Sequence, residues 1–131
     1  MLKNIRCGNS LIADPKIAGN KAFNWEEEFP FIRHSERSEE SQNGFDIIIG
    51  NPPYVDIKGM NPSVVDYLFN KYFSTENRIN LYASFIEKAI NLLKKDGYFS
   101  FIIPNSILYN DSYKKLREFI IKLGGVVKKG C

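Results

Sequence analysis

The sequence predicts an α/β fold with a mostly parallel sheet and flanking helices. Two short apolar runs, Phe45 to Ile49 and Tyr98 to Pro104, have the composition of strands buried on both faces. They alternate with segments of helical periodicity, which is typical of this fold class. The 131 residues suffice for one modest domain, and 44% hydrophobic residues allow a real core.

The charge, the cysteines and the distribution of apolar residues bear on the class of protein. The net charge of +3 is small and the basic residues are scattered, so charge neither indicates nor excludes a nucleic-acid partner. Cys7 and Cys131 have no metal-ligand spacing, so we expect reduced thiols and no metal site. The first residues, MLKNIRCGNSLIADP, lack the apolar stretch of a signal peptide, and no run approaches the roughly 20 apolar residues that cross a bilayer. These features predict a cytoplasmic soluble domain.

The first third of the chain carries few signals of regular structure. Leu2 to Arg6 is a short strand candidate, and Cys7 to Ser10 is typical of a turn. Residues 33–44 are polar and repetitive and lack apolar side chains, so we expect a disordered, insertion-like loop there. His34, the only histidine, lies in this loop, and a mobile segment cannot hold a catalytic base in position.

Helical periodicity dominates the rest of the chain. Residues 61–73 predict a helix with Asn61 or Ser63 as N-cap and an apolar face of Val65, Leu68, Phe69 and Tyr72. The clearest helix covers residues 81–95, and we expect Gly97 to end it in the left-handed conformation. A third helix is predicted over residues 112–125, followed by the start of a strand. The order therefore indicates an α/β domain with a mostly parallel sheet.

Four residues directly after the first buried strand suggest a binding site. Ligands of open α/β sheets bind at the carboxyl ends of the strands, where Asn51, Pro52, Pro53 and Tyr54 lie. Asn51 offers a carbonyl oxygen as acceptor, the two prolines make the segment rigid, and Tyr54 offers an aromatic face. Two acceptors and a ring suit a planar –NH₂ group. Acceptors that lie outside the plane of the –NH₂ group favour a tetrahedral nitrogen. The lone pair of such a nitrogen is localised and can attack.

This motif and its surroundings resemble a known family. The run IIGNPPY (48–54) is similar to the catalytic motif of amino-group methyltransferases that use S-adenosylmethionine. CGNSLI, GFDIIIGNPPYV and LYASFIEKAINLLKKDGYFSFIIPNSIL narrow the resemblance to adenine-specific (N6) DNA methyltransferases of restriction–modification systems, in the style of the fused type II restriction-and-methylation enzymes. The resemblance covers most of the chain apart from residues 33–44.

The resemblance implies roles for particular residues. Asn51 and the carbonyl of Pro52 bind the N6 amino group, with Pro53 in the same rigid motif, and Tyr54 stacks on an adenine flipped out of duplex DNA. Asn9 and Ser10 match the loop that contacts the adenine of the cofactor, where the family commonly has aspartate. Asparagine keeps an acceptor there, although Asn9 suits a plain turn equally well.

The resemblance also implies a fragment. The family's catalytic domain begins with a strand and an F-x-G-x-G loop that holds the methionine part of the cofactor, and this sequence has no such motif. We therefore expect residues 1–131 to form a partial catalytic domain without the first strands, the closing hairpin or a target-recognition domain. The strand before Asn51 then presents an unpaired apolar edge, so we expect marginal stability and weak or absent cofactor binding.

Two other interpretations stay open. Glutamine-N5 protein methyltransferases share the NPPY motif, because a carboxamide nitrogen poses the same geometric problem. A catalytically silent remnant is the second, given the missing cofactor loop and the polar insertion. Both interpretations leave the NPPY motif at the end of a strand. A plain turn is the simplest interpretation of NPPY, and in it the two prolines only end the strand.

Overall fold

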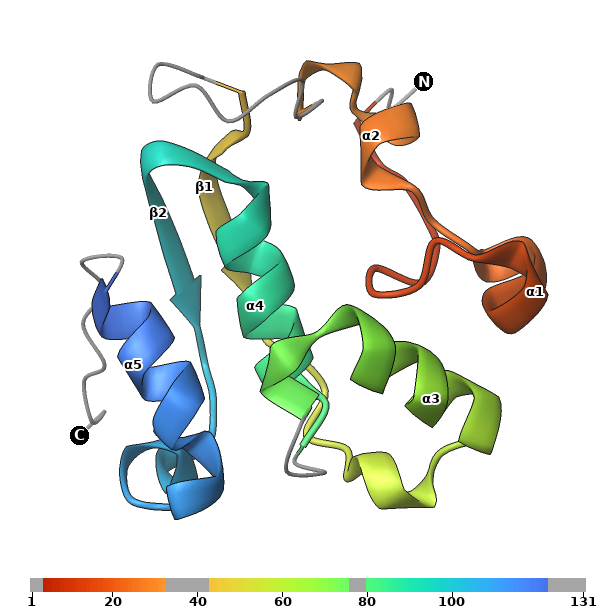
Figure 1. Ribbon diagram of the computed structural model, residues 1–131. Helices are drawn as coiled ribbons and strands as arrows, with labels where there is room; N and C mark the ends of the chain where they lie inside the picture. The colour runs from red at the N-terminus through yellow and green to blue at the C-terminus, as the bar shows by residue number, and fades with distance from the viewer. Residues whose placement is uncertain (1–3, 33–42, 76–79, 123–131) are drawn as a thin grey trace.

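The computed structural model describes residues 4–32, 43–75 and 80–122, which form an α/β unit around a small parallel sheet (Figure 1). This confirms the predicted fold class. Several predictions fall outside the described residues: the loop at 33–42 with His34, the start of the strand at Leu2, and everything from Leu123 to Cys131.

The sheet consists of two parallel strands, β1 (Phe45–Gly50) and β2 (Leu93–Phe101). Ile47 pairs with Tyr98 and Gly50 pairs with Phe101, so both strands end at the same edge. Within the described residues, β2 is the neighbour of β1 in the sheet. A register shift between Phe45 and Ile47 marks the point where β2 bends toward its helix.

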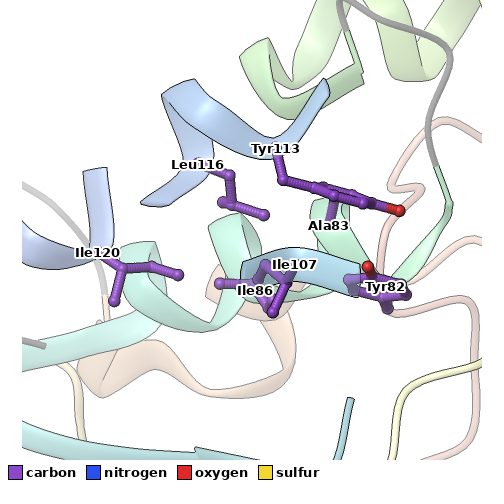
Figure 2. Close-up of a cluster of buried hydrophobic side chains, with 7 residues drawn as sticks. All are labelled: Tyr82, Ala83, Ile86, Ile107, Tyr113, Leu116 and Ile120. Atoms are coloured by element: carbon purple, nitrogen blue, oxygen red, sulfur yellow. The ribbon is translucent and has the colours of Figure 1, made fainter. Parts of the chain in front are cut away.

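One face of the sheet carries the core. Phe99 and Phe101 pack against a buried cluster that joins helix α4 (Tyr82–Leu92), helix α5 (Lys114–Lys122) and the turns before it. Figure 2 shows the two helices meeting through this cluster, whose buried members are Tyr82, Ala83, Ile86, Ile107, Tyr113, Leu116 and Ile120. Burial of these side chains supplies much of the driving force for folding.

Within the described residues, the opposite face of the sheet is exposed, which contradicts the prediction of strands buried on both faces. Ile47, Ile49, Tyr98 and Ile102 are 62%, 76%, 76% and 72% exposed. The physical reason is that α4 and α5 both pack on the face of Phe99 and Phe101, and no described element covers the other face. An apolar composition identified the strands correctly but not how much of each is covered.

Helix α3 (Pro62–Lys71) begins as the sequence predicts. The side chain of Asn61 accepts a hydrogen bond from the Ser63 amide at 3.0 Å, and Pro62 occupies the first turn. Leu68 and Tyr72 are buried in a second cluster with Leu11 and Ile12. The hydroxyl of Tyr72 donates to the Leu11 carbonyl at 2.8 Å, which ties α3 to the N-terminal segment.

The N-terminal segment differs from the prediction. Residues 4–6 form no strand and are exposed, and Arg6 makes an ion pair with Glu28 at 2.7 Å. Two short helices follow, α1 (Pro15–Ala18) and α2 (Trp25–Glu28), in a region without helical periodicity. Each is capped by a preceding polar side chain, Asp14 or Asn24, so local capping rather than an apolar stripe defines them.

The junction of α4 and β2 is also a correction. The helix ends at Leu92 instead of Lys95, and the strand begins at Leu93 and ends at Phe101 instead of Pro104. Leu93 pairs with Phe45 and Lys94 makes an ion pair with Asp46, so contacts with β1 override the local helix propensity. The left-handed position is Asp96 (φ 62°), not Gly97.

The conformation of Asp96 yields a stability prediction. Left-handed backbone costs a residue with a Cβ roughly 1–2 kcal/mol, and glycine avoids that cost. We expect Asp96→Gly to raise the free energy of unfolding by up to about 1 kcal/mol. Lys95→Gly is the matched control and should destabilise, because Lys95 has no positive φ to relieve. Urea unfolding checks both, and a loss of stability in Asp96→Gly contradicts the argument.

Glu87 yields a prediction about pH. The carboxylate is buried on α4 and accepts hydrogen bonds from the amides of Phe73 (3.3 Å) and Ser74 (2.9 Å). Burial raises the pKa of Glu87 above its ordinary value of 4.5, and the hydrogen bonds from Ser74 and Phe73 oppose this only in part. The folded state then holds a proton that the unfolded chain has lost.

The stabilisation from this group is therefore fully present below pH 4.5 and is lost as the pH rises through the raised pKa of the folded state. We expect Glu87→Gln to flatten the fall in the free energy of unfolding above pH 4.5. Urea unfolding across a pH series measures this. Glu118→Gln, at an exposed position on α5, is the control and should follow the parent curve.

Candidate active site

The candidate site begins where β1 ends. Asn51 is exposed, Pro52 is buried and Pro53 is exposed, so the rigid segment has one side against the protein and one side toward solvent. Tyr54 is 48% exposed, which leaves much of its ring accessible. The segment therefore presents an exposed amide and a half-exposed aromatic residue at the carboxyl edge of the sheet.

The hydroxyl of Tyr54 joins the segment to the end of β2. It donates to the Ile102 carbonyl at 2.6 Å and lies 3.1 Å from Oδ1 of Asn51. The Tyr54 ring meets the ring of Tyr82 on α4 edge to face, with centroids 6.1 Å apart and an interplanar angle of 84°. Contacts from two other elements thus set the position of Tyr54.

The backbone on either side of the segment is also anchored. The Ile102 amide donates to the Gly50 carbonyl at 3.3 Å, which continues the sheet hydrogen bonding up to the site. Beyond Tyr54, the Leu81 amide donates to the Val55 carbonyl at 2.8 Å, just before α4 begins. The site is held between the ends of both strands and the start of α4.

A cleft of about 510 Å³ opens beside the segment, between β1, α4 and the N-terminal segment. A cavity of about 230 Å³ adjoins it, and Ser10 and Pro53 line both. The structure therefore brings Asn9 and Ser10, which line the smaller cavity, against the motif some 40 residues later in the chain. The larger cleft is lined mainly by apolar side chains, including Trp25, Ile48, Phe85, Ala89 and Leu92.

Asn9 has a clear role in the turn. Its Oδ1 accepts a hydrogen bond from the Leu11 amide at 3.1 Å, and its own amide donates to the Lys21 carbonyl at 2.6 Å. The indole of Trp25 donates to the Ser10 carbonyl at 2.9 Å. Because a carbonyl oxygen has two lone pairs, the Asn9 side chain retains acceptor capacity toward the cavity. Contact of Asn9 and Ser10 with a cofactor remains a prediction.

Sequence reasoning missed Lys88, the one charged side chain among the residues that line the larger cleft. Burial lowers the pKa of Lys88, the charge of Lys71 adds to this effect, and Glu26 opposes it. The signal was present in the sequence, because Phe85, Lys88 and Leu92 follow helical spacing on one face of α4. The core-facing apolar stripe of the same helix is the stronger pattern in the sequence, and Lys88 lies off that stripe.

Two further observations concern metal sites and membrane-spanning helices. Within residues 4–32, 43–75 and 80–122, no three His, Cys, Asp or Glu side chains lie close enough to hold a metal ion. No helix in these ranges has the length and apolar character needed to cross a membrane.

Comparisons with known proteins identify a family and several relatives with similar sequences. The sequence profile of the family described as "Eco57I restriction-modification methylase" matches residues 1–126. The chain is 40% identical over 79 residues to the type II restriction enzyme and methyltransferase RM.Eco57I of Escherichia coli, covering 58% of this chain and 8% of that protein. It is 34% identical over 92 residues to the type II methyltransferase M.TthHB8I of Thermus thermophilus, covering 65% and 22%.

A third relative is the adenine-specific methyltransferase BrxX of Escherichia coli O9:H4, 29% identical over 77 residues, which cover 59% of this chain and 6% of that protein. The chain thus spans between 6% and 22% of the length of these relatives.

Gly8 yields a prediction about the turn that carries Asn9. A Cβ at this position would lie 2.6 Å from Cδ2 and 2.8 Å from Cβ of Phe23, which is buried. We expect Gly8→Ala to destabilise the fold by about 1–3 kcal/mol through overpacking and to change the fluorescence of the nearby Trp25. Gly59→Ala is the control, because a Cβ there meets nothing within 4 Å. Equal stability of the two variants contradicts the prediction.

Proposed function

The chain belongs to the Eco57I restriction-modification methylase family, and from this premise we propose that it carries the target-base site of an adenine-N6 DNA methyltransferase. The observation that carries the proposal is the meeting of Asn51 and Ser10 around one cleft at the carboxyl edge of a parallel sheet, with the Tyr54 hydroxyl 3.1 Å from Oδ1 of Asn51. The adenine-specific names of relatives such as BrxX support the choice of base. The chemistry of the motif supports an amino group as target.

The proposed partner is duplex DNA with the target adenine turned out of the helix, since enzymes that act on a base must remove it from the stack. The half-exposed ring of Tyr54 provides a surface on which a flipped base stacks. The exposed amide of Asn51 lies beside that ring and supplies an acceptor for the amino hydrogens. The carbonyl of Pro52 is proposed as the second acceptor.

In this proposal the residues act by aligning a weak nucleophile. The N6 lone pair is delocalised into the purine ring, and acceptors outside the plane favour the tetrahedral nitrogen that attacks. The nitrogen would form the new bond to the methyl carbon as the bond from the donor's sulfonium sulfur to that carbon breaks and leaves a neutral thioether. It would then lose a proton to water, because alkylation makes it acidic. No general base is required at the site, which fits a motif without His, Lys or Glu.

The proposed methyl donor is S-adenosylmethionine, whose sulfonium supplies an activated methyl group. The smaller cavity suits a purine ring, because Leu11, Met60 and Phe85 give it apolar walls while Asn9 and Ser10 give it a polar edge. Ser10 and Pro53 line both cavities, so a ligand here adjoins the segment that binds the base. We also propose a cytoplasmic location, in keeping with the free, exposed thiol of Cys7.

The test measures transfer of labelled methyl from S-adenosylmethionine to duplex DNA and, separately, to total protein. We expect label in DNA as N6-methyladenine, formed slowly because the sequence predicts weak cofactor binding, with Asn51→Ala reducing the rate by at least about 10²-fold, as loss of a transition-state hydrogen bond does elsewhere. Asn70→Ala is the control, because Asn70 lies on the exposed side of α3 and bonds only to the Asp66 carbonyl there.

The other outcomes are equally informative. Label in protein instead of DNA supports the glutamine-N5 alternative and overturns the choice of adenine. No transfer to either substrate by a folded chain contradicts catalysis by this chain and favours the catalytically silent alternative. Equal loss in the two asparagine variants contradicts a specific role for Asn51.

A further inference from the structure

The hydroxyl of Tyr54 makes contacts that stacking alone does not require. An aromatic ring suffices to stack on a base, as phenylalanine would. In this structure the hydroxyl instead reaches two carbonyl oxygens, that of Ile102 at 2.6 Å and Oδ1 of Asn51 at 3.1 Å. It therefore connects the ring, the amide that accepts the amino group and the end of the neighbouring strand.

These contacts depend on the sheet. Gly50 pairs with Phe101, so the residues that follow each strand leave the sheet side by side. The Ile102 carbonyl is therefore presented next to the segment that begins at Asn51. Because Ile102 also donates its amide to Gly50 at 3.3 Å, this acceptor is fixed by the backbone of β1 and β2 and not by a flexible side chain.

The ring of Tyr54 has a rigid support as well. Tyr82, against which it packs, is 1% exposed and stacks on Tyr113 with centroids 5.4 Å apart (Figure 2). The hydroxyl of Tyr82 lies 3.4 Å from Oγ of Ser106. Because Tyr113 and Ser106 hold the buried Tyr82 ring in place, this ring limits the rotation of the Tyr54 ring that packs against it.

We propose that the Tyr54 hydroxyl is a positioning group for Asn51, a role that rests on the proposed function and is additional to stacking. Its single proton is shared between two acceptors, the Ile102 carbonyl at 2.6 Å and Oδ1 of Asn51 at 3.1 Å, in a bifurcated hydrogen bond. Of the two lone pairs on that oxygen, one faces the hydroxyl and the other remains for an amino hydrogen of the substrate. The amide is thus oriented before the base arrives.

The test compares Tyr54→Phe, which keeps the ring, with the control Tyr109→Phe, at a residue that is 70% exposed. In the ¹⁵N-labelled chain, we expect the side-chain NH₂ of Asn51 to lose its heteronuclear NOE in Tyr54→Phe and to retain it in Tyr109→Phe. In the methyl-transfer assay we expect kcat to fall about fivefold with little change in KM for DNA, the equivalent of one hydrogen bond.

Two results overturn the proposal. One is an Asn51 side chain that is as ordered in Tyr54→Phe as in the parent chain. The other is a rise in KM with kcat unchanged, which indicates that the hydroxyl contributes to binding alone. Failure of the proposed function is distinguishable from both, because absence of methyl transfer in the parent leaves the NMR comparison intact.

Discussion

The parallel pairing of β1 with β2 is the constraint on which the rest of the structure depends. Because the strands run in the same direction, the chain must leave both of them at one edge, and the Gly50–Phe101 pair aligns their ends. Asn51 and Tyr54 follow one strand and Ile102 follows the other. An antiparallel pair would separate these residues by the length of the sheet, and the hydrogen bond from Tyr54 to Ile102 could not form.

The same pairing explains why the sheet is covered so unevenly. The helix that connects two parallel strands packs back on one face, and α4 does so over Phe99 and Phe101, where α5 joins it. The other face keeps Ile47 and Ile49 exposed, and burying one such side chain stabilises a fold by about 1.5–3 kcal/mol. The stability of the described residues therefore depends on packing at the face of the sheet that α4 covers. Tyr82, which lies on this helix, also supports the Tyr54 ring.

Local signals in the sequence predicted the features that local physics determines. The apolar run before Asn51 identified β1, and the Asn61–Pro62 pair identified the start of α3. The predicted end of α4 was wrong. Lysines at positions 94 and 95 favour a helix, but Leu93 pairs with Phe45, so the chain joins the sheet from Leu93 onward. Coverage of a strand likewise depends on distant elements, so composition could not predict the bare face.

The candidate site divides in the same way. Rigidity of Asn51 to Tyr54 follows from two adjacent prolines and is visible in the sequence. The contact of Tyr54 with Ile102 joins residues 48 positions apart, and it follows only once the register of the sheet is known. Hydrogen bonds made in the folded protein hold these groups in the arrangement described above. In the proposed function, a site built in this way would need little rearrangement as charge develops on a reacting nitrogen, and such preorganisation is a major source of catalytic rate.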